Sequence, residues 1–144
     1  MTTPPLADAR VRSADDLTDC WSAVLGSAEF GTRSLWLTWF ATDGRQLPVV
    51  VPVDDLPLAP DPALLVGLRE VHRSVLGDQL GGAGHLALAL CRPGAPQVTA
   101  DDDAWAEALR SVLDDDPVAG TWSLHVAASG TVVPLVGAPP VRSR

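Results

Sequence analysis

The chain has 144 residues, of which 47% are hydrophobic, and a formal net charge of −8 with a sequence pI of about 4.5. This composition excludes a disordered chain, and the excess of acidic groups argues against binding the phosphate backbone of a nucleic acid. No apolar run approaches the roughly 20 residues that a membrane helix needs, and two cysteines are too few for a disulfide framework. We therefore expect a cytoplasmic protein that binds neither nucleic acid nor membrane.

The first segment expected to fold is a short amphipathic helix. Residues 1–12 carry no apolar periodicity, and we expect them to form a flexible N-terminal arm. Ser13 and Asp16 have the spacing of a capping box, and apolar residues follow at helical spacing as far as Leu25. Gly26 is a natural position for the helix to end.

A β-hairpin is predicted next. Residues 34–41 alternate with apolar side chains on both faces, so this strand should be covered on both sides. Trp36 and Trp39 point to opposite faces of the strand. Residues 43–44 (Asp-Gly) are a strong turn signal, and the partner strand, residues 46–53, contains two prolines that favour an edge position.

A second helix is expected after the proline-rich segment that follows the hairpin. Asp61 has the side chain of a helix cap, Pro62 suits the first helical position, and Gly77 is the expected end. We interpret His72, which adjoins the apolar stripe, as a packing or surface residue and not as a metal ligand. The residues of that stripe, expected to face the core, include Leu64, Leu65, Leu68, Val71, Val75 and Leu76.

The central strand and a third helix come next. Residues 85–91 are nearly all apolar, as in a strand buried on both faces. Thr99 and Asp102 have the spacing of a second capping box, and residues 101–103, all aspartates, favour the positive end of the helix dipole. We therefore read this acidic run as a helix start and not as a metal site.

A final hairpin completes the predicted fold. Residues 121–128 and 131–136 form two strands around a Ser-Gly turn, and residues 137–144 are expected to be a flexible tail. The element order predicts an α/β (α+β) fold with a mixed central sheet of about five strands flanked by about three helices. No repeat or linker divides it, so residues 13–136 should form a single domain.

Between Leu35 and Leu135, this order resembles the JAB/MPN metal-dependent isopeptidase fold, in particular its bacterial RadC-like branch. The features that carry the resemblance are the hairpin around Asp43-Gly44, the helix opened by Asp61-Pro62, the strand His85 to Leu90 leading into Arg92-Pro93-Gly94, the helix start Thr99-Ala-Asp-Asp102, and the hairpin Leu124 to Gly130.

The resemblance also implies where a zinc site would lie. In that family the central strand ends in His-x-His-Pro, with a Ser and an Asp following; both His and the Asp bind zinc, and a Glu handles the proton. On this chain Pro93 matches the motif proline, while Leu90 and Arg92 occupy the two His positions. Thr99 and Asp102 stand for the Ser and the Asp if one residue is deleted.

Without a deletion, Ala100 stands for the Ser of the family motif and Asp103 for the Asp. Neither Leu nor Arg ligates zinc, and the chain's few glutamates lie outside the predicted strands, so the general base is missing as well. The resemblance therefore implies a non-catalytic relative without metal or cofactor.

The function that we favour is a protein-binding or scaffolding module. Its partner would be another protein or a second copy of the chain, as in a homodimer. Trp36 or Trp39 could contribute to the contact surface, because tryptophan is enriched at interfaces.

Two alternatives remain open. One is a hydrolase with an unrecognised site near the end of the central strand, built from Cys91, Asp102 and His125, with His85 as a further candidate. The other is an anion site made by Arg92 and the backbone amides at the start of the third helix, although the aspartates there oppose an anion.

Overall fold

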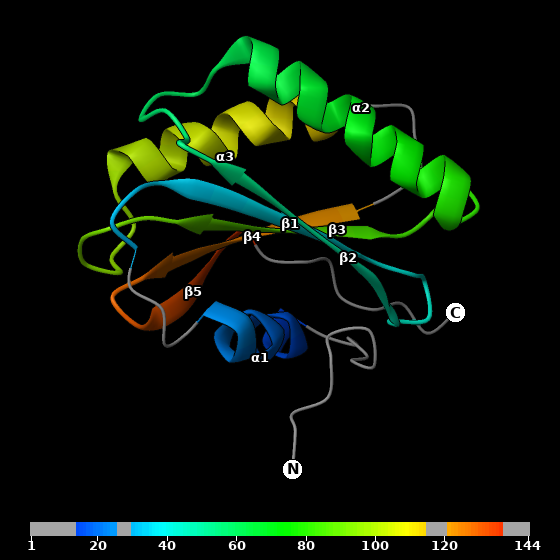
Figure 1. Ribbon diagram of the computed structural model, residues 1–144, viewed down its shortest axis with the longest axis horizontal. Coiled ribbons are helices and arrows are strands. Elements are labelled where there is room, and N and C mark those ends of the chain that lie inside the picture. Colours follow the sequence, from blue (N-terminus) through cyan, green and yellow to red (C-terminus); the bar gives the residue numbers. More distant parts are fainter. Residues whose placement is uncertain (1–13, 26–29, 115–120, 137–144) are drawn as a thin grey trace.

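Five strands form one mixed sheet in the order β2-β1-β3-β4-β5 (Figure 1). The strands are β1 (Ser34–Phe40), β2 (Gln46–Asp54), β3 (His85–Cys91), β4 (Thr121–Ala128) and β5 (Thr131–Val136). Neighbouring strands are antiparallel except β3 and β4, which are parallel and are therefore joined by a crossover through α3 (Ala100–Leu113). With α1 (Ala14–Leu25) and α2 (Pro62–Gln79), the structure confirms a single α+β domain of three helices and a five-stranded mixed sheet.

This computed structural model describes residues 14–25, 30–114 and 121–136. Several predictions from the sequence lie outside these residues: the arm at 1–12, the capping residue Ser13, the helix end at Gly26 and the tail at 137–144. Within the described ranges, no helix is both long enough and apolar enough to cross a membrane.

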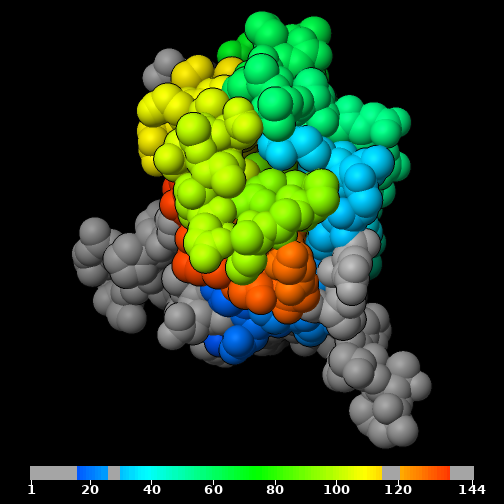
Figure 2. Space-filling view, turned by 90° about the vertical axis from the view of Figure 1, so that its left-hand side faces the viewer, coloured from blue at the N-terminus to red at the C-terminus, as the bar shows by residue number. Residues whose placement is uncertain are grey.

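The helices cover the two faces of the sheet unequally. Helix α1 lies on one face, and α2 and α3 lie on the other (Figure 1). Figure 2 shows the same layers from the side, with α1 in blue at the bottom and the green and yellow of α2 and α3 at the top. The three inner strands, β1, β3 and β4, are therefore buried on both sides, which is why the central strand lacks polar alternation.

Each face of the sheet has its own hydrophobic core. The core under α2 and α3 is built from large side chains, among them Leu37, Trp39, Leu88, Trp105 and Leu109. The smaller core under α1 combines Leu17 and Trp21 of the helix with short side chains of the sheet, including Ala87, Ala89 and Ala127. Because alanine projects little from the sheet, the large residues of α1 fill most of this space.

Strand β1 confirms the predicted alternation. Its odd-numbered residues, such as Leu35 and Leu37, belong to the core under α2 and α3, whereas Trp36 and Phe40 belong to the core under α1. Its partner β2 forms one edge of the sheet, as its prolines predicted.

Helix α2 begins as predicted but ends later. The side chain of Asp61 accepts a hydrogen bond from the backbone of Ala63, and the helix continues past Gly77 to Gln79, so the predicted end at Gly77 is wrong. A Cβ at Gly77 would meet nothing within 4 Å, so nothing in its surroundings calls for a glycine. The chain turns instead at Gly81 and Gly82, both of which have positive φ angles.

The buried stripe of α2 contains His72 and not Val71. Val71 is 43% exposed, so its predicted core position is wrong, while His72 is only 5% exposed. The buried face comprises Leu65, Leu68, His72, Val75 and Leu76. Val71 has the right spacing from Leu68 and Val75, but it lies at the edge of this face and is exposed. Trp39 Nε1 donates to His72 Nδ1 at 3.1 Å, which confirms His72 as a packing residue.

Candidate functional site

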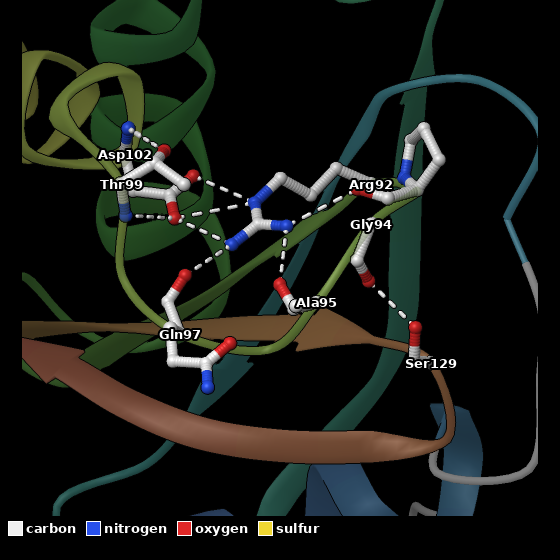
Figure 3. Close-up of polar contacts among 8 residues, drawn as sticks. Arg92, Gly94, Ala95, Gln97, Thr99, Asp102 and Ser129 are labelled. Atoms are coloured by element: carbon white, nitrogen blue, oxygen red, sulfur yellow. Dashed lines mark hydrogen bonds and ion pairs between the residues drawn. The ribbon is translucent and has the colours of Figure 1, made fainter.

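The end of β3 is occupied by a buried ion pair between Arg92 and Asp102 (Figure 3). Arg92 follows β3 directly, and Asp102 lies in the first turn of α3; their exposed fractions are 4% and 0%. Arg92 Nε donates to Asp102 Oδ1 at 2.9 Å, and Nη2 donates to Oδ2 at 2.8 Å. This side-on, bidentate arrangement is the geometry in which a guanidinium and a carboxylate bind most strongly.

The rest of the Arg92 guanidinium is hydrogen bonded to the loop that leads to α3. Nη1 donates to the carbonyl oxygens of Pro93 (3.1 Å) and Ala95 (2.8 Å), and Nη2 donates to that of Gln97 (2.8 Å). Together with the two bonds to Asp102, these contacts use all five N–H groups of the side chain. The loop is thus wrapped around Arg92, which has no donor left for an external anion.

Asp102 also belongs to the helix cap predicted from the sequence. Its Oδ2 accepts a hydrogen bond from the backbone N–H of Thr99 at 3.0 Å, and its own N–H donates to Thr99 Oγ1 at 3.2 Å. Burial by itself raises the pKa of Asp102, but the hydrogen bonds from Arg92 and Thr99 and the Arg92 charge outweigh it and lower the pKa below its ordinary value of 3.8. Asp102 is therefore a carboxylate, already bound by three donors.

The remaining positions that correspond to the zinc motif have structural roles. Leu90 is fully buried in the core under α2 and α3, and Pro93 is exposed in the loop. Among the residues that the structure describes, no group of three or more His, Cys, Asp and Glu side chains could hold a metal ion. The donors present therefore do not fit the zinc site that the resemblance would place here.

The three hydrolase candidates lie on two different faces of the sheet. Cys91 belongs to the core under α1, and His125 contacts Thr18 of the same helix. Asp102 lies in α3, on the opposite face. The sheet therefore separates the carboxylate from both other members of the proposed set.

Burial further limits the chemistry of Cys91 and His125. It raises the pKa of the Cys91 thiol to about 12, although a hydrogen bond with Ser34 acts in the opposite direction. It lowers the pKa of His125 to about 4, and His125 Nε2 is hydrogen bonded to Thr18 Oγ1 at 2.8 Å. At neutral pH the cysteine is thus a thiol and the histidine an uncharged imidazole.

The fourth candidate, His85, contacts two hydroxyl groups that the sequence analysis did not single out. Its Nδ1 is hydrogen bonded to Thr121 Oγ1 at 2.6 Å and its Nε2 to Ser123 Oγ at 2.8 Å. Burial, followed by the nearby His72 and His125, lowers the pKa of His85 to about 4. The available signal was the spacing of Thr121, Ser123 and His125 at every second residue, which puts all three on one face of the strand.

Of the two tryptophans predicted to contribute to a contact surface, only Trp36 reaches solvent. Trp39 is completely buried and is hydrogen bonded to His72, whereas Trp36 is partly exposed and donates from Nε1 to Ser34 Oγ at 3.2 Å. The structure therefore leaves Trp36 as the residue of this pair that a partner could touch.

A further residue at this end of the sheet was missed by the sequence analysis. Arg33, which precedes β1, has a guanidinium whose Nε and Nη2 are buried and have no hydrogen-bond partner. The other buried side-chain nitrogens of the described residues that lack a partner are Trp21 Nε1, Arg69 Nε and His125 Nδ1. No pattern in the sequence distinguishes Arg33 from the other arginines, because its lack of partners is a property of the tertiary structure.

No protein-family model matches the chain, and no curated protein or solved structure matches it either.

Proposed function

We propose that this domain is a non-catalytic protein-binding or scaffolding module of the JAB/MPN type that its sequence resembles. The observation that carries the proposal is the Arg92–Asp102 pair, in which both side chains are buried and hydrogen bonded within the domain. A catalytic carboxylate or cation must be able to meet a substrate, and neither of these groups has that freedom.

The states of the other candidate groups support the same function. Cys91 is a thiol with a pKa of about 12, far from the thiolate that attacks a substrate. Ser123 contacts a histidine, but its side chain is completely buried, and the opposite nitrogen of that histidine contacts a hydroxyl group in place of a carboxylate. These contacts support a structural role for the groups and not acyl transfer.

The edges of the sheet favour contact through side chains over sheet extension. Edge strand β2 contains Pro48 and Pro52, and edge strand β5 contains Pro134. Because proline has no N–H to donate, it interrupts the ladder that an added strand would form. A partner, or a second copy of the chain, would therefore bind through surface residues such as Trp36.

The proposal is tested by measuring association and hydrolysis on the same purified protein. Sedimentation velocity over a concentration series gives the self-association constant, and chemical cross-linking identifies the contact residues. Trp36→Gln should weaken association about tenfold or more, and circular dichroism must show that the variant is still folded because Trp36 also packs against the core under α1. Val66→Gln, at an exposed site of α2, should leave association unchanged. Assembly unchanged by Trp36→Gln would contradict the assignment of the contact surface to this residue.

The alternative function is a hydrolase, and the contact between His85 and Ser123 is the observation in its favour. A fluorophosphonate probe that labels Ser123 in the native protein, and fails to do so in His85→Gln, would establish this alternative. Turnover of ester, peptide or isopeptide substrates that disappears in Ser123→Ala would likewise overturn the non-catalytic proposal.

A further inference from the structure

Arg33 is fixed at the same end of the sheet as the Arg92–Asp102 pair. Its carbonyl oxygen accepts a hydrogen bond from the backbone N–H of Leu56 at 3.0 Å. The next residue, Ser34, pairs with Cys91 of β3, so Arg33 enters the sheet beside the point where Arg92 leaves it. Two arginines thus lie at the carboxyl end of β3, on neighbouring segments of the chain.

The two arginines differ in what their guanidinium groups contact. Arg92 donates from every nitrogen, whereas Nε and Nη2 of Arg33 are buried without an acceptor. Three of the other described arginines, Arg69, Arg73 and Arg110, have a glutamate oxygen within 4.0 Å. Within the described part of this acidic chain, Arg33 is thus a partly buried cation with no assigned counter-ion, although buried donors without acceptors are costly.

The chemistry of the missing acceptor can be read from Arg92. Nε and Nη2 form one edge of the guanidinium, and this is the edge by which Arg92 holds both oxygens of Asp102. In Arg33 the same two nitrogens are unpaired. The vacant edge therefore has the geometry for one planar carboxylate.

The surrounding charge favours a carboxylate over a phosphate. Asp54 and Asp55 are exposed on the adjoining segment, which is held to Arg33 through Leu56, and the whole chain carries a net charge of −8. A phosphate group brings up to two negative charges into this field, whereas a carboxylate brings one.

We propose that Arg33 binds a single aspartate or glutamate side chain of a protein partner through Nε and Nη2, at the carboxyl end of β3. The inference rests on the proposed protein-binding function and names the chemistry of the contact. Arg33 is partly exposed, so a rotation of its long side chain brings this edge to an incoming carboxylate. The acidic group then neutralises the charge in the way that Asp102 neutralises Arg92.

The test uses the purified chain and two peptides that differ only in charge, acetyl-(Asp-Gly)3-amide and acetyl-(Asn-Gly)3-amide. In ¹⁵N-resolved NMR spectra of the arginine Nε–H groups, the aspartyl peptide should shift the Arg33 signal along a saturable curve. The asparaginyl peptide should leave it in place. Arg33→Gln should abolish the peptide-induced shifts near Leu56, whereas Arg45→Gln, which removes the same charge from an exposed hairpin residue, should preserve them.

A second measurement separates a binding role from a structural one. Replacing a partly buried cation whose Nε and Nη2 lack an acceptor by an apolar side chain of similar length should stabilise the free domain, so Arg33→Met should raise the melting temperature by about 3 °C or more. A lower melting temperature in Arg33→Met would show that the side chain supports the fold and would overturn the proposal. The proposal would also be overturned if the Arg33 Nε–H signal did not shift with the aspartyl peptide, or if it shifted more with inorganic phosphate at equal concentration.

These outcomes are independent of the broader proposal. If a protein partner binds equally well to Arg33→Gln, the inference about Arg33 fails while the protein-binding function stands. If the peptide binds at Arg33 but the domain proves to be a hydrolase, the Arg33 site stands and the proposed function fails.

Discussion

Arg92 Nη2 lies 2.8 Å from Asp102 Oδ2, and the two side chains are almost completely shielded from water. This pair joins the end of the central strand to the first turn of α3, and the intervening loop supplies its carbonyl oxygens to the same guanidinium. At the position where the resemblance would place a metal, a buried ion pair thus joins β3 to α3.

Removing one partner of this pair should destabilise the domain strongly. Asp102→Ala leaves the Arg92 charge buried and unpaired, and we expect the free energy of unfolding in urea to fall by about 3–5 kcal/mol. Thr99→Ala, which removes the other half of the capping box, should cost only about 1 kcal/mol. Glu107→Gln, in an exposed ion pair with Arg110, should change stability by less than about 0.5 kcal/mol. Equal losses in Asp102→Ala and Thr99→Ala would show that the ion pair adds nothing to the cap.

Stability should decrease as the pH falls from neutral. The pKa of His125 is lowered from 6.5 to about 4 in the folded protein, so the unfolded chain takes up a proton first as the pH falls. The free energy of unfolding is therefore highest above pH 6.5. As the pH falls to about 4, protonation of His125 in the unfolded chain lowers it by about 3 kcal/mol. Urea unfolding between pH 7 and pH 4 measures it.

His85 has a similarly lowered pKa and should add to the same slope. A His125→Gln variant should therefore show a shallower pH dependence than the native chain, and not a flat one. At still lower pH, protonation of Asp102 should remove its pairing with Arg92 as well, because the pKa of this carboxyl is also lowered by folding. A native chain equally stable at pH 7 and pH 4 would contradict these assignments.

Both cysteines should resist alkylation in the folded protein. Burial raises the pKa of Cys20 to about 11 and that of Cys91 to about 12. At pH 8 the thiolate fractions are therefore about one in a thousand and about one in ten thousand. Mass spectrometry after brief exposure to iodoacetamide should find little labelling of the native protein, with Cys91 slower than Cys20, and full labelling in urea. Rapid labelling of native Cys91 would instead favour the hydrolase alternative.

The turn between β4 and β5 should be sensitive to the loss of one hydroxyl group. Ser129 has a φ angle of 50°, and its Oγ donates to the carbonyl oxygen of Gly94 at 2.6 Å, which ties the turn to the loop around Arg92 (Figure 3). Ser129→Ala keeps the unfavourable backbone angle and loses the bond, so it should cost about 1 kcal/mol. Ser129→Gly loses the bond but removes the backbone cost, so its free energy of unfolding should stay within about 0.5 kcal/mol of the native value.

A Ser129→Gly variant as unstable as Ser129→Ala would show that the hydrogen bond, and not the backbone angle, determines the stability of this turn. Thermal or urea unfolding of the two variants measured in parallel decides between these cases.

Local patterns in the sequence were sufficient for most of the elements. The capping box at Thr99 and Asp102, the cap at Asp61 and the apolar run of β3 each depend on residues within a few positions of one another. Two of the predictions for α2 were wrong. The helix ends at Gln79 and not at Gly77, and the chain turns at Gly81 and Gly82. On the core face, His72 is buried and Val71 is exposed.

The functional site was less accessible to sequence reasoning. Cys91, His125 and Asp102 were grouped because they were expected to converge at the end of the central strand, with His125 on a neighbouring strand. Cys91, the last residue of β3, points to the face covered by α1, whereas Asp102 lies in α3 on the other face. Which helix covers which face, and therefore that Asp102 and His125 are separated by the sheet, depends on packing between distant segments.

Local sequence patterns were therefore enough to predict a single α+β domain and the approximate positions of its strands and helices. Those features follow from short-range periodicity, caps and turn residues. The packing of the folded domain is what pairs Arg92 fully while Arg33 Nε and Nη2 stay unpaired, and what leaves Trp36 partly exposed while Trp39 is buried. Ion pairing and burial are set by which distant side chains meet in space, and no local pattern encodes that.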